Sequence, residues 1–295
     1  MSTHRPADHR PPHAHLVQLD VAWEDPTRNH DRVRQLLDKA DVRPGDLVLL
    51  PEMFATGFSF NIERTNDKAG ATMSFFVELA DDLQAIVQGG RTVASCHSCA
   101  ARNVMSMVAP GGRMLCEYAK IHLFSPGGEQ EKFEPGRDVL TYEWGATSDQ
   151  RHATSKPSQV ADRVSPVASL RVQPAICYDL RFPELFRAGL KAGAELIALG
   201  ACWPSVRQHH WRSLLIARAI ENQCFVLGCN RVGDDPPKMD TFPGLHYAGG
   251  SIAVGPQGDV LGELDDKPGV LSVPLDPAEV RGWRDKFGAW KDRRL

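Results

Sequence analysis

The sequence predicts an α/β fold, and three observations lead to it. Short apolar runs alternate with amphipathic segments along the chain, as in folds whose sheets are covered by helices. The chain has 295 residues, of which 42% are hydrophobic and 24% charged, so it has enough apolar material for a large core. No change of composition marks a linker. We therefore expect a single domain over residues 14–295.

The first half of the chain carries clear strand and helix signals. Residues 46–54 form an almost fully apolar run, typical of a strand buried on both faces. Residues 26–40 begin with Pro26 and place apolar residues at helical spacing, which predicts a helix. The other elements expected here are strands at 15–23, 92–96, 103–110 and 115–124, a helix at 72–87 and a loop at 125–137.

The second half continues the same alternation. The expected elements are strands at 168–176, 195–203 and 224–232, helices at 182–194 and 205–223, a hairpin at 250–263, a strand at 269–276 and an amphipathic segment at 279–295. We interpret the polar stretch 145–166 as a surface insertion. Residues 1–13 are expected to form a flexible N-terminal tail.

Charge and hydropathy argue against several classes of partner. The net charge is −3, which predicts no general affinity for nucleic acid or for an anionic membrane. No apolar run approaches the roughly 20 residues of a membrane helix. The N-terminus lacks the apolar centre of a signal peptide. We therefore expect a cytoplasmic protein.

The seven cysteines are odd in number and irregularly spaced, so reduced thiols are expected. Cys96 and Cys99 have the spacing of a zinc-ligand pair. Zinc sites need about four ligands, and no second matching pair is present. We interpret the two residues as buried or turn thiols and expect no metal site.

Three residues with complementary chemistry each stand at the end of a probable strand. Cys177 follows an apolar run and precedes an amphipathic one, so a sharp turn should hold its thiol rigidly. Glu52 follows the first part of the run 46–54, and Lys120 lies within the segment 115–124. A free thiol has a pKa of about 8.5, so it needs a base or a cation beside it to become a strong nucleophile.

These residue types suit a cysteine hydrolase. Glu52 can act as the general base if it is buried, because desolvation disfavours the charged carboxylate. Lys120 can stabilise the thiolate and later a tetrahedral oxyanion, with the backbone N–H of Tyr178 as a second donor. The scheme needs no histidine, although His122 lies close to Lys120 in the sequence.

The segments LPEMFATGFS, YAKIHLF and ICYDLRFPELFR resemble the glutamate, lysine and cysteine motifs of the nitrilase (carbon–nitrogen hydrolase) superfamily. The resemblance extends over residues 14–275. It is strongest to the omega-amidases, which hydrolyse the terminal amide of 2-oxoglutaramate and related oxo acid amides. It implies a four-layer αββα sandwich, no cofactor, and a homodimer or higher homo-oligomer.

The resemblance also implies a second glutamate in the loop after the lysine, seven residues before a glycine. Counting back from Gly136 selects Glu129, with Glu131 as the nearby alternative. Its implied role is to hold Lys120 or to position the substrate amide.

Three further residues are candidates for binding the substrate. Tyr178 adjoins the nucleophile. Arg181 either pairs with a neighbour to fix the turn or binds a substrate carboxylate. Trp203 either lines the pocket or packs in the core.

The resemblance therefore implies an amidase that cleaves a small carboxylate-bearing amide through a cysteine thioester and releases ammonia. Alternatives within the enzyme class are a nitrilase, an N-carbamoyl hydrolase and a deaminated-glutathione amidase. A non-catalytic member that binds a metabolite or a protein is the alternative from a different class.

Overall fold

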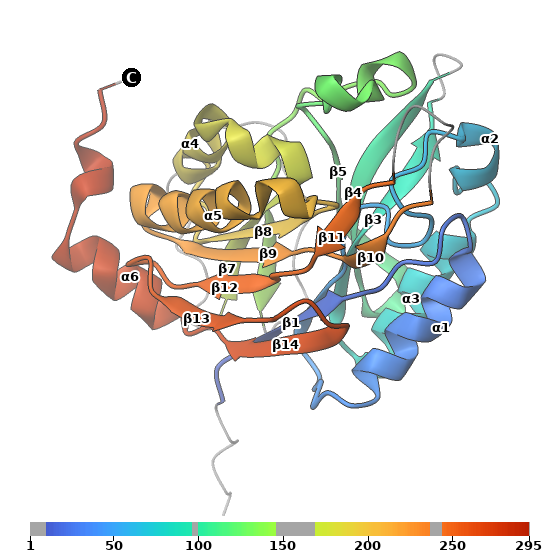
Figure 1. Cartoon of the computed structure of the whole chain (residues 1–295). Coiled ribbons are helices and arrows are strands. Elements are labelled where there is room, and N and C mark those ends of the chain that lie inside the picture. The colour runs from blue at the N-terminus through green and yellow to red at the C-terminus, as the bar shows by residue number, and fades with distance from the viewer. Residues whose placement is uncertain (1–9, 96–99, 146–168, 237–243, 295) are drawn as a thin grey trace, which may run out of the picture.

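The computed structural model describes residues 10–95, 100–145, 169–236 and 244–294. Two six-stranded sheets lie face to face, with helices on their outer sides (Figure 1). Helices α1 (Pro26–Leu37) and α3 (Ala71–Leu83) cover one sheet, and α4 (Pro183–Lys191) and α5 (Gln208–Asn222) cover the other. The predicted four-layer αββα arrangement is confirmed. Two further helices are α2 (Ile62–Thr65) and α6 (Pro277–Lys286).

The first sheet has the strand order β14-β1-β2-β3-β4-β5. Its strands are β1 (His13–Gln18), β2 (Leu47–Leu49), β3 (Ile86–Ala94), β4 (Ala101–Ala109), β5 (Arg113–Ala119) and β14 (Gly269–Pro274). The pairs β1–β2 and β2–β3 are parallel, and the outer pairs are antiparallel.

The second sheet has the order β13-β12-β9-β8-β7-β6, with a parallel centre of β7, β8 and β9. Its strands are β6 (Tyr142–Gly145), β7 (Ser169–Ile176), β8 (Leu196–Gly200), β9 (Phe225–Cys229), β12 (Ile252–Val254) and β13 (Val260–Glu263). A separate two-stranded ribbon joins β10 (Val232–Asp234) to β11 (His246–Ala248).

The two-residue period of a strand explains how the sheets are held together. In β2, Leu47 and Leu49 point into the core between the sheets, whereas Val48 packs with the residues under α1 and α3. All three side chains are buried. This is the pattern expected of a strand covered on both faces, and it explains why the run 46–54 lacks polar alternation.

Some sequence predictions were wrong in detail. The helix expected over 72–87 ends at Leu83, because Gln84 adopts a left-handed conformation and Ile86 and Val87 pair with β2. The strand expected over 46–54 is only Leu47–Leu49, and strand β6 was not predicted. The hairpin turning at Pro256–Gly258 is present between β12 and β13.

Two expected segments fall largely outside the described residues. The first is the insertion at 145–166, of which only Gly145 is described. The second is the tail at 1–13, of which only residues 10–13 are described. Within the described part of that tail, Arg10 and the backbone N–H of His13 bind the Asp46 carboxylate. His13 is also the first residue of β1.

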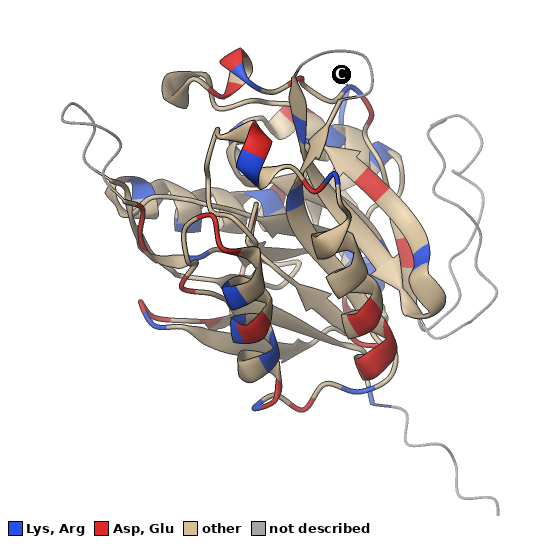
Figure 2. Ribbon diagram, turned by 90° about the vertical axis from the view of Figure 1, so that its right-hand side faces the viewer, with Lys and Arg blue, Asp and Glu red and all other residues tan. Residues whose placement is uncertain are grey.

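The surface of the described residues mixes charges of both signs, as Figure 2 shows along the helices and strands of one face. Among these residues, no helix has both the length and the apolar character needed to cross a membrane.

Candidate active site

Cys177 directly follows β7 and opens the 3-10 turn Cys177–Arg181, which leads into α4. Its φ of +44° lies in the left-handed region, which costs a residue other than glycine about 1–2 kcal/mol. Conformations of this kind persist where the surrounding structure holds them, often at functional sites. The expected sharp turn is therefore present, and it leaves Cys177 8% exposed on the wall of a pocket.

Glu52 lies just beyond β2, where two glycines let its backbone sit between the sheets. A Cβ atom added to Gly90 of β3 would come within 2.7 Å of the Glu52 Cα atom. One added to Gly200 of β8 would come within 3.1 Å of the Glu52 backbone nitrogen. Glycine at these positions thus allows Glu52 to be fully buried.

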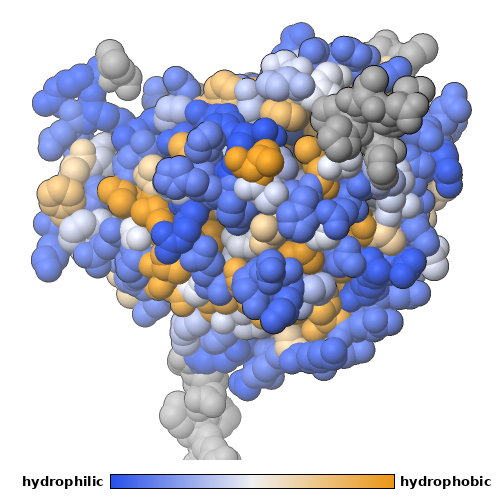
Figure 3. All heavy atoms as spheres, viewed as in Figure 1, coloured by the Kyte–Doolittle hydropathy of each residue, from blue (hydrophilic) through white to orange (hydrophobic). Residues whose placement is uncertain are grey.

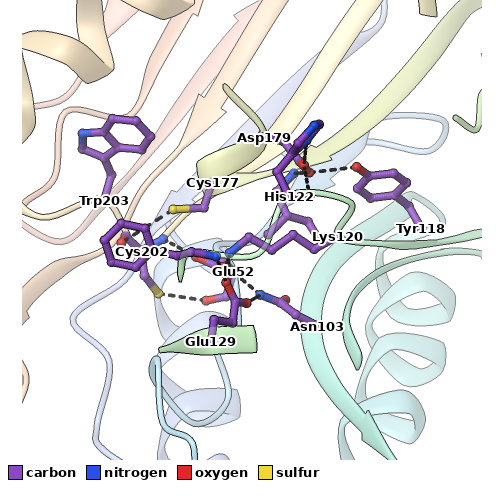
Figure 4. A network of polar contacts seen from close by, with 12 residues as sticks. Glu52, Asn103, Tyr118, Lys120, His122, Glu129, Cys177, Asp179, Cys202 and Trp203 are labelled. Carbon is purple, nitrogen blue, oxygen red and sulfur yellow. Dashed lines mark hydrogen bonds and ion pairs between the residues drawn. The ribbon is translucent and has the colours of Figure 1, made fainter. Parts of the chain in front are cut away.

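Lys120 directly follows β5 and places its ammonium group between two carboxylates (Figure 4). Its Nζ atom donates to Glu52 Oε1 and to Glu129 Oε2, both at 2.8 Å. Asn103 Nδ2 donates to the same two carboxylates, at 2.7 Å to Glu52 Oε1 and 2.9 Å to Glu129 Oε1. The backbone N–H of Cys202 donates to Glu52 Oε2 at 3.0 Å. These contacts leave the buried carboxylates little freedom to move.

The charges of this cluster act on the nearby thiol. Burial raises the pKa of the Cys177 thiol well above its ordinary value, and the negative charge of Glu52 raises it further, while Lys120 acts in the opposite direction. Burial lowers the pKa of Lys120, but Glu129 and Glu52 outweigh burial and raise it. The resting site therefore holds a neutral thiol beside a charged ammonium group.

The pocket beside Cys177 has an empty volume of about 370 Å³, including its open mouth. Apolar and aromatic side chains form most of its wall, together with two thiols and two arginines. They are Phe58, Phe124, Tyr178, Trp203, Pro204, Leu245, Cys177, Cys202, Arg181 and Arg207. Such mostly apolar clefts with a few polar groups are typical of sites for small molecules.

The structure brings together Glu52, Lys120, Cys177 and Glu129, which come from three separate segments of the sequence (Figure 4). Glu129 is fully buried and also accepts the N–H of Phe124 at 2.6 Å, whereas Glu131 is exposed. Of the two candidate glutamates, Glu129 is therefore the one in contact with Lys120. The catalytic roles of these residues stay predictions.

The three candidate binding residues all line the pocket. Trp203 lines the pocket and also packs in the core, where its ring centroid lies 5.5 Å from that of Trp211. Both positions considered for Trp203 from the sequence are therefore observed. The Arg181 guanidinium lies 4.8 Å from the Trp203 ring centroid. Among the described residues Arg181 forms no ion pair with a carboxylate, and its Nη2 atom lies 3.4 Å from Nδ1 of His210. The choice between fixing the turn and binding a substrate carboxylate stays a prediction.

Sequence reasoning missed three residues of the site, which are Asn103, Asp179 and Arg207. Asn103 lies within β4 at the start of the largely apolar run 103–110, and a polar residue in a buried strand is a usable signal. Asp179 stands two residues after Cys177. Arg207 carries no comparable signal in the sequence.

The described residues contain no cluster of three or more His, Cys, Asp or Glu side chains that could hold a metal ion. Cys96 and Cys99, which were interpreted as buried or turn thiols, lie outside the described part of the chain. The five described cysteines are all free thiols.

Comparison with known proteins agrees with the fold and identifies the family. The family model described as carbon–nitrogen hydrolase matches residues 14–285. The chain is 33% identical to the "Hydrolase in agr operon" of Staphylococcus aureus, over 95% of this chain and 97% of that protein. It is 31% identical to the omega-amidase YafV of Escherichia coli (strain K12), over 94% of each.

A solved structure of similar sequence shares the fold. XC1258 from Xanthomonas campestris, described as a CN-hydrolase superfamily protein with an arsenic adduct in the active site, superposes with a TM-score of 0.79 at 31% identity. The match covers 97% of this chain and 98% of that one. The resemblance noted in the motifs is thereby confirmed: this chain belongs to the carbon–nitrogen hydrolase family and is an amidase.

Proposed function

We propose that this amidase is an omega-amidase that hydrolyses the terminal amide of a small carboxylate-bearing substrate such as 2-oxoglutaramate. The observation that carries the proposal is the buried contact of Lys120 with Glu52 and Glu129 directly beside Cys177, at a pocket of about 370 Å³. The similarity to an omega-amidase supports this choice of substrate.

In the proposed first step, the Cys177 sulfur attacks the amide carbonyl carbon and its proton moves to Glu52. The thiol loses the proton that Glu52 gains, so the buried cluster acquires no additional charge as the oxyanion forms. Lys120 has three N–H donors, of which Glu52 and Glu129 accept two. The third can bind the oxyanion, together with the N–H of Tyr178.

The second half of the reaction returns the site to its starting state. The C–N bond breaks as Glu52 passes its proton to the leaving nitrogen, and ammonia departs from the Cys177 thioester. Water then attacks the thioester while Glu52 accepts one of its protons, and the released sulfur recovers that proton. Acid–base assistance of this kind contributes about 10²- to 10⁴-fold.

A panel of substrates tests this proposal. Ammonia release is measured with 2-oxoglutaramate, a nitrile, an N-carbamoyl amino acid and uncharged amides, and deaminated glutathione is followed by its cleavage products. We expect the highest kcat/KM for 2-oxoglutaramate. A higher value for the nitrile, the carbamoyl compound or deaminated glutathione would select the corresponding alternative. Binding of these compounds without turnover of any would indicate a non-catalytic member.

The role of Cys177 is tested separately. Cys177→Ala and Cys177→Ser should abolish turnover while circular dichroism shows a folded chain. A folded Cys177→Ala protein that hydrolysed amides at the parent rate would show that the nucleophile is assigned wrongly.

We also propose that the protein forms a homodimer through α5 and the β12–β13 hairpin. Ile220 of α5 and the neighbouring Val260 and Leu261 of β13 are exposed apolar side chains. Figure 3, seen from the same side as Figure 1, shows apolar residues exposed among hydrophilic ones. Light scattering should give a dimer for the parent and a monomer for Ile220→Glu, with Met114→Glu on the distant β5 edge as the control.

The free state of the five described thiols supports the expectation of a cytoplasmic enzyme.

A further inference from the structure

Arg207 contributes a second cationic group to the pocket. It ends the 3-10 turn Ser205–Arg207, just before α5. The Trp203 Nε1–H donates to the backbone oxygen of Arg207 at 2.8 Å, so the turn is tied to the pocket wall. The Arg207 guanidinium lies 5.5 Å from the centroid of the Phe124 ring. The side chain is half-buried and lines the pocket together with Cys177.

Arg181 and Arg207 lie over one aromatic wall. The Arg181 guanidinium is 4.8 Å from the Trp203 ring centroid and 5.8 Å from that of Tyr178. The Tyr178 ring in turn meets the Phe124 ring edge-on, with centroids 5.1 Å apart. Contacts with aromatic faces orient a guanidinium group without neutralising its charge, so its N–H donors remain available to an anion.

The charges of the pocket favour a negatively charged ligand. Among the described residues, neither Arg181 nor Arg207 forms an ion pair, and no Asp or Glu lines the pocket. The Arg181 side chain has one polar contact, 3.4 Å from its Nη2 to Nδ1 of the exposed His210. Two half-buried cations in an apolar pocket suit a carboxylate, which accepts paired hydrogen bonds from a guanidinium fork.

We propose that Arg207 is a specificity-determining residue that, together with Arg181, binds the substrate carboxylate at the end remote from the scissile amide. This inference rests on the proposed omega-amidase function and adds to it the residue that separates carboxylate-bearing amides from uncharged ones. With the carboxylate held between the two arginines, the terminal amide extends toward Cys177 within the same pocket.

The test compares 2-oxoglutaramate with pentanamide, an uncharged amide of equal chain length. Arg207→Gln should lower the ratio of their kcat/KM values by about 10- to 100-fold, chiefly through KM for 2-oxoglutaramate. Arg207→Lys keeps the positive charge but loses the paired guanidinium donors. Its kcat/KM ratio should therefore lie between those of Arg207→Gln and the parent. Arg43→Gln, which alters an exposed arginine paired with Asp41, is the matched control and should keep the parent ratio.

A fall of both kcat/KM values by the same factor in Arg207→Gln would indicate a structural role and overturn the proposal, as would a parent-like ratio. Calorimetry with 2-oxoglutarate provides a readout that does not depend on turnover. The Cys177→Ala protein should bind this carboxylate, and Arg207→Gln added to it should weaken binding by a similar factor. Failure of the amidase function would show as absent ammonia release with binding retained, whereas parent-like binding in the Arg207 variant would overturn only the carboxylate site.

Discussion

The Asp179 carboxylate joins the segment of the nucleophile to the segment of the lysine, because its Oδ1 atom accepts a hydrogen bond from His122 Nδ1 at 2.8 Å. The same carboxylate accepts the backbone N–H of His122 at 3.0 Å, the Tyr118 hydroxyl at 2.8 Å and the backbone N–H of Ile176 at 3.0 Å. Asp179 is fully buried. It thus sets the distance between the turn that carries Cys177 and the end of β5.

We predict that Asp179→Asn lowers both stability and kcat. An amide can accept fewer of these hydrogen bonds and places an N–H₂ group against buried donors, which should cost about 3 kcal/mol of unfolding free energy. Urea unfolding and ammonia release measure the two effects. The control is Asp82→Asn, which breaks an exposed pair with Arg34 and should cost at most about 1 kcal/mol. Parent-like stability and kcat for Asp179→Asn would contradict this role.

The glutamate after the lysine offers a matched pair of substitutions. Glu129→Gln removes a buried negative charge next to Lys120 and places an N–H₂ group in the cluster, so we expect kcat/KM to fall by at least about 10²-fold. Glu131→Gln changes an exposed residue and should stay within about twofold of the parent. Steady-state kinetics with 2-oxoglutaramate distinguishes the two. Equal effects of both variants would remove the special role of Glu129.

The thiol titration of Cys177 should shift in opposite directions when its two charged neighbours are changed. Burial raises the pKa of Cys177, Glu52 raises it further and Lys120 lowers it. Glu52→Gln should therefore move thiolate formation to lower pH, although turnover falls because the base is missing. Lys120→Met should move it to higher pH. Because the pKa of Cys177 lies well above its ordinary value, the assay compares the rates of alkylation by iodoacetamide at one fixed pH of about 9, with Cys177 located by mass spectrometry. The rate follows the thiolate fraction, so it should rise in Glu52→Gln and fall in Lys120→Met.

Cys116 provides an internal control for this titration. It lies in the core between the sheets, where burial raises its pKa to about 12. Alkylation of Cys116 should stay slow in the parent, in Glu52→Gln and in Lys120→Met while these proteins remain folded. A change of the Cys177 alkylation rate in the same direction for both variants would contradict the charge arrangement described here.

The left-handed backbone of Cys177 predicts an unusual order of stability. Cys177→Gly and Cys177→Ala should both be inactive, but glycine adopts a φ of +44° without steric cost. We expect Cys177→Gly to be more stable than Cys177→Ala by about 1 kcal/mol. Thermal or urea unfolding of the two variants measures the difference. The reverse order would show that the turn is not strained at this residue.

Most helices and strands were predictable because buried residues recur at the helical or the strand period in the sequence. The helix wrongly extended over residues 84–87 shows where this periodicity fails to decide. Ile86 and Val87 suit a helix or a strand equally well, and their pairing with Leu47 and Val48 of β2 decides between the two. Strand β6 was missed because its alternation of Tyr142 and Trp144 covers only four residues.

The site was predictable to the extent that its chemistry is concentrated in short motifs. Glu52, Lys120 and Cys177 each stand at or just beyond a strand end, and strand ends present side chains to a common edge. Glu129 was recognised only through the resemblance of its loop to a known family. Asn103 carries a local signal, a polar residue in a largely apolar run, but its two carboxylate partners are distant in the sequence. Arg207 carries no such signal, and only the folded chain places it beside Phe124 and the pocket.

The order of apolar and polar residues along this chain was sufficient to predict an α/β fold and to mark Cys177 as a candidate nucleophile, because both depend on local periodicity and residue type. The four-layer arrangement was predicted only through the resemblance to a known family. Which carboxylates contact Lys120, and which arginines share a pocket with Cys177, depended on the packing of two sheets against each other. That packing brings together segments separated by tens of residues, and their mutual distances have no counterpart in the linear sequence.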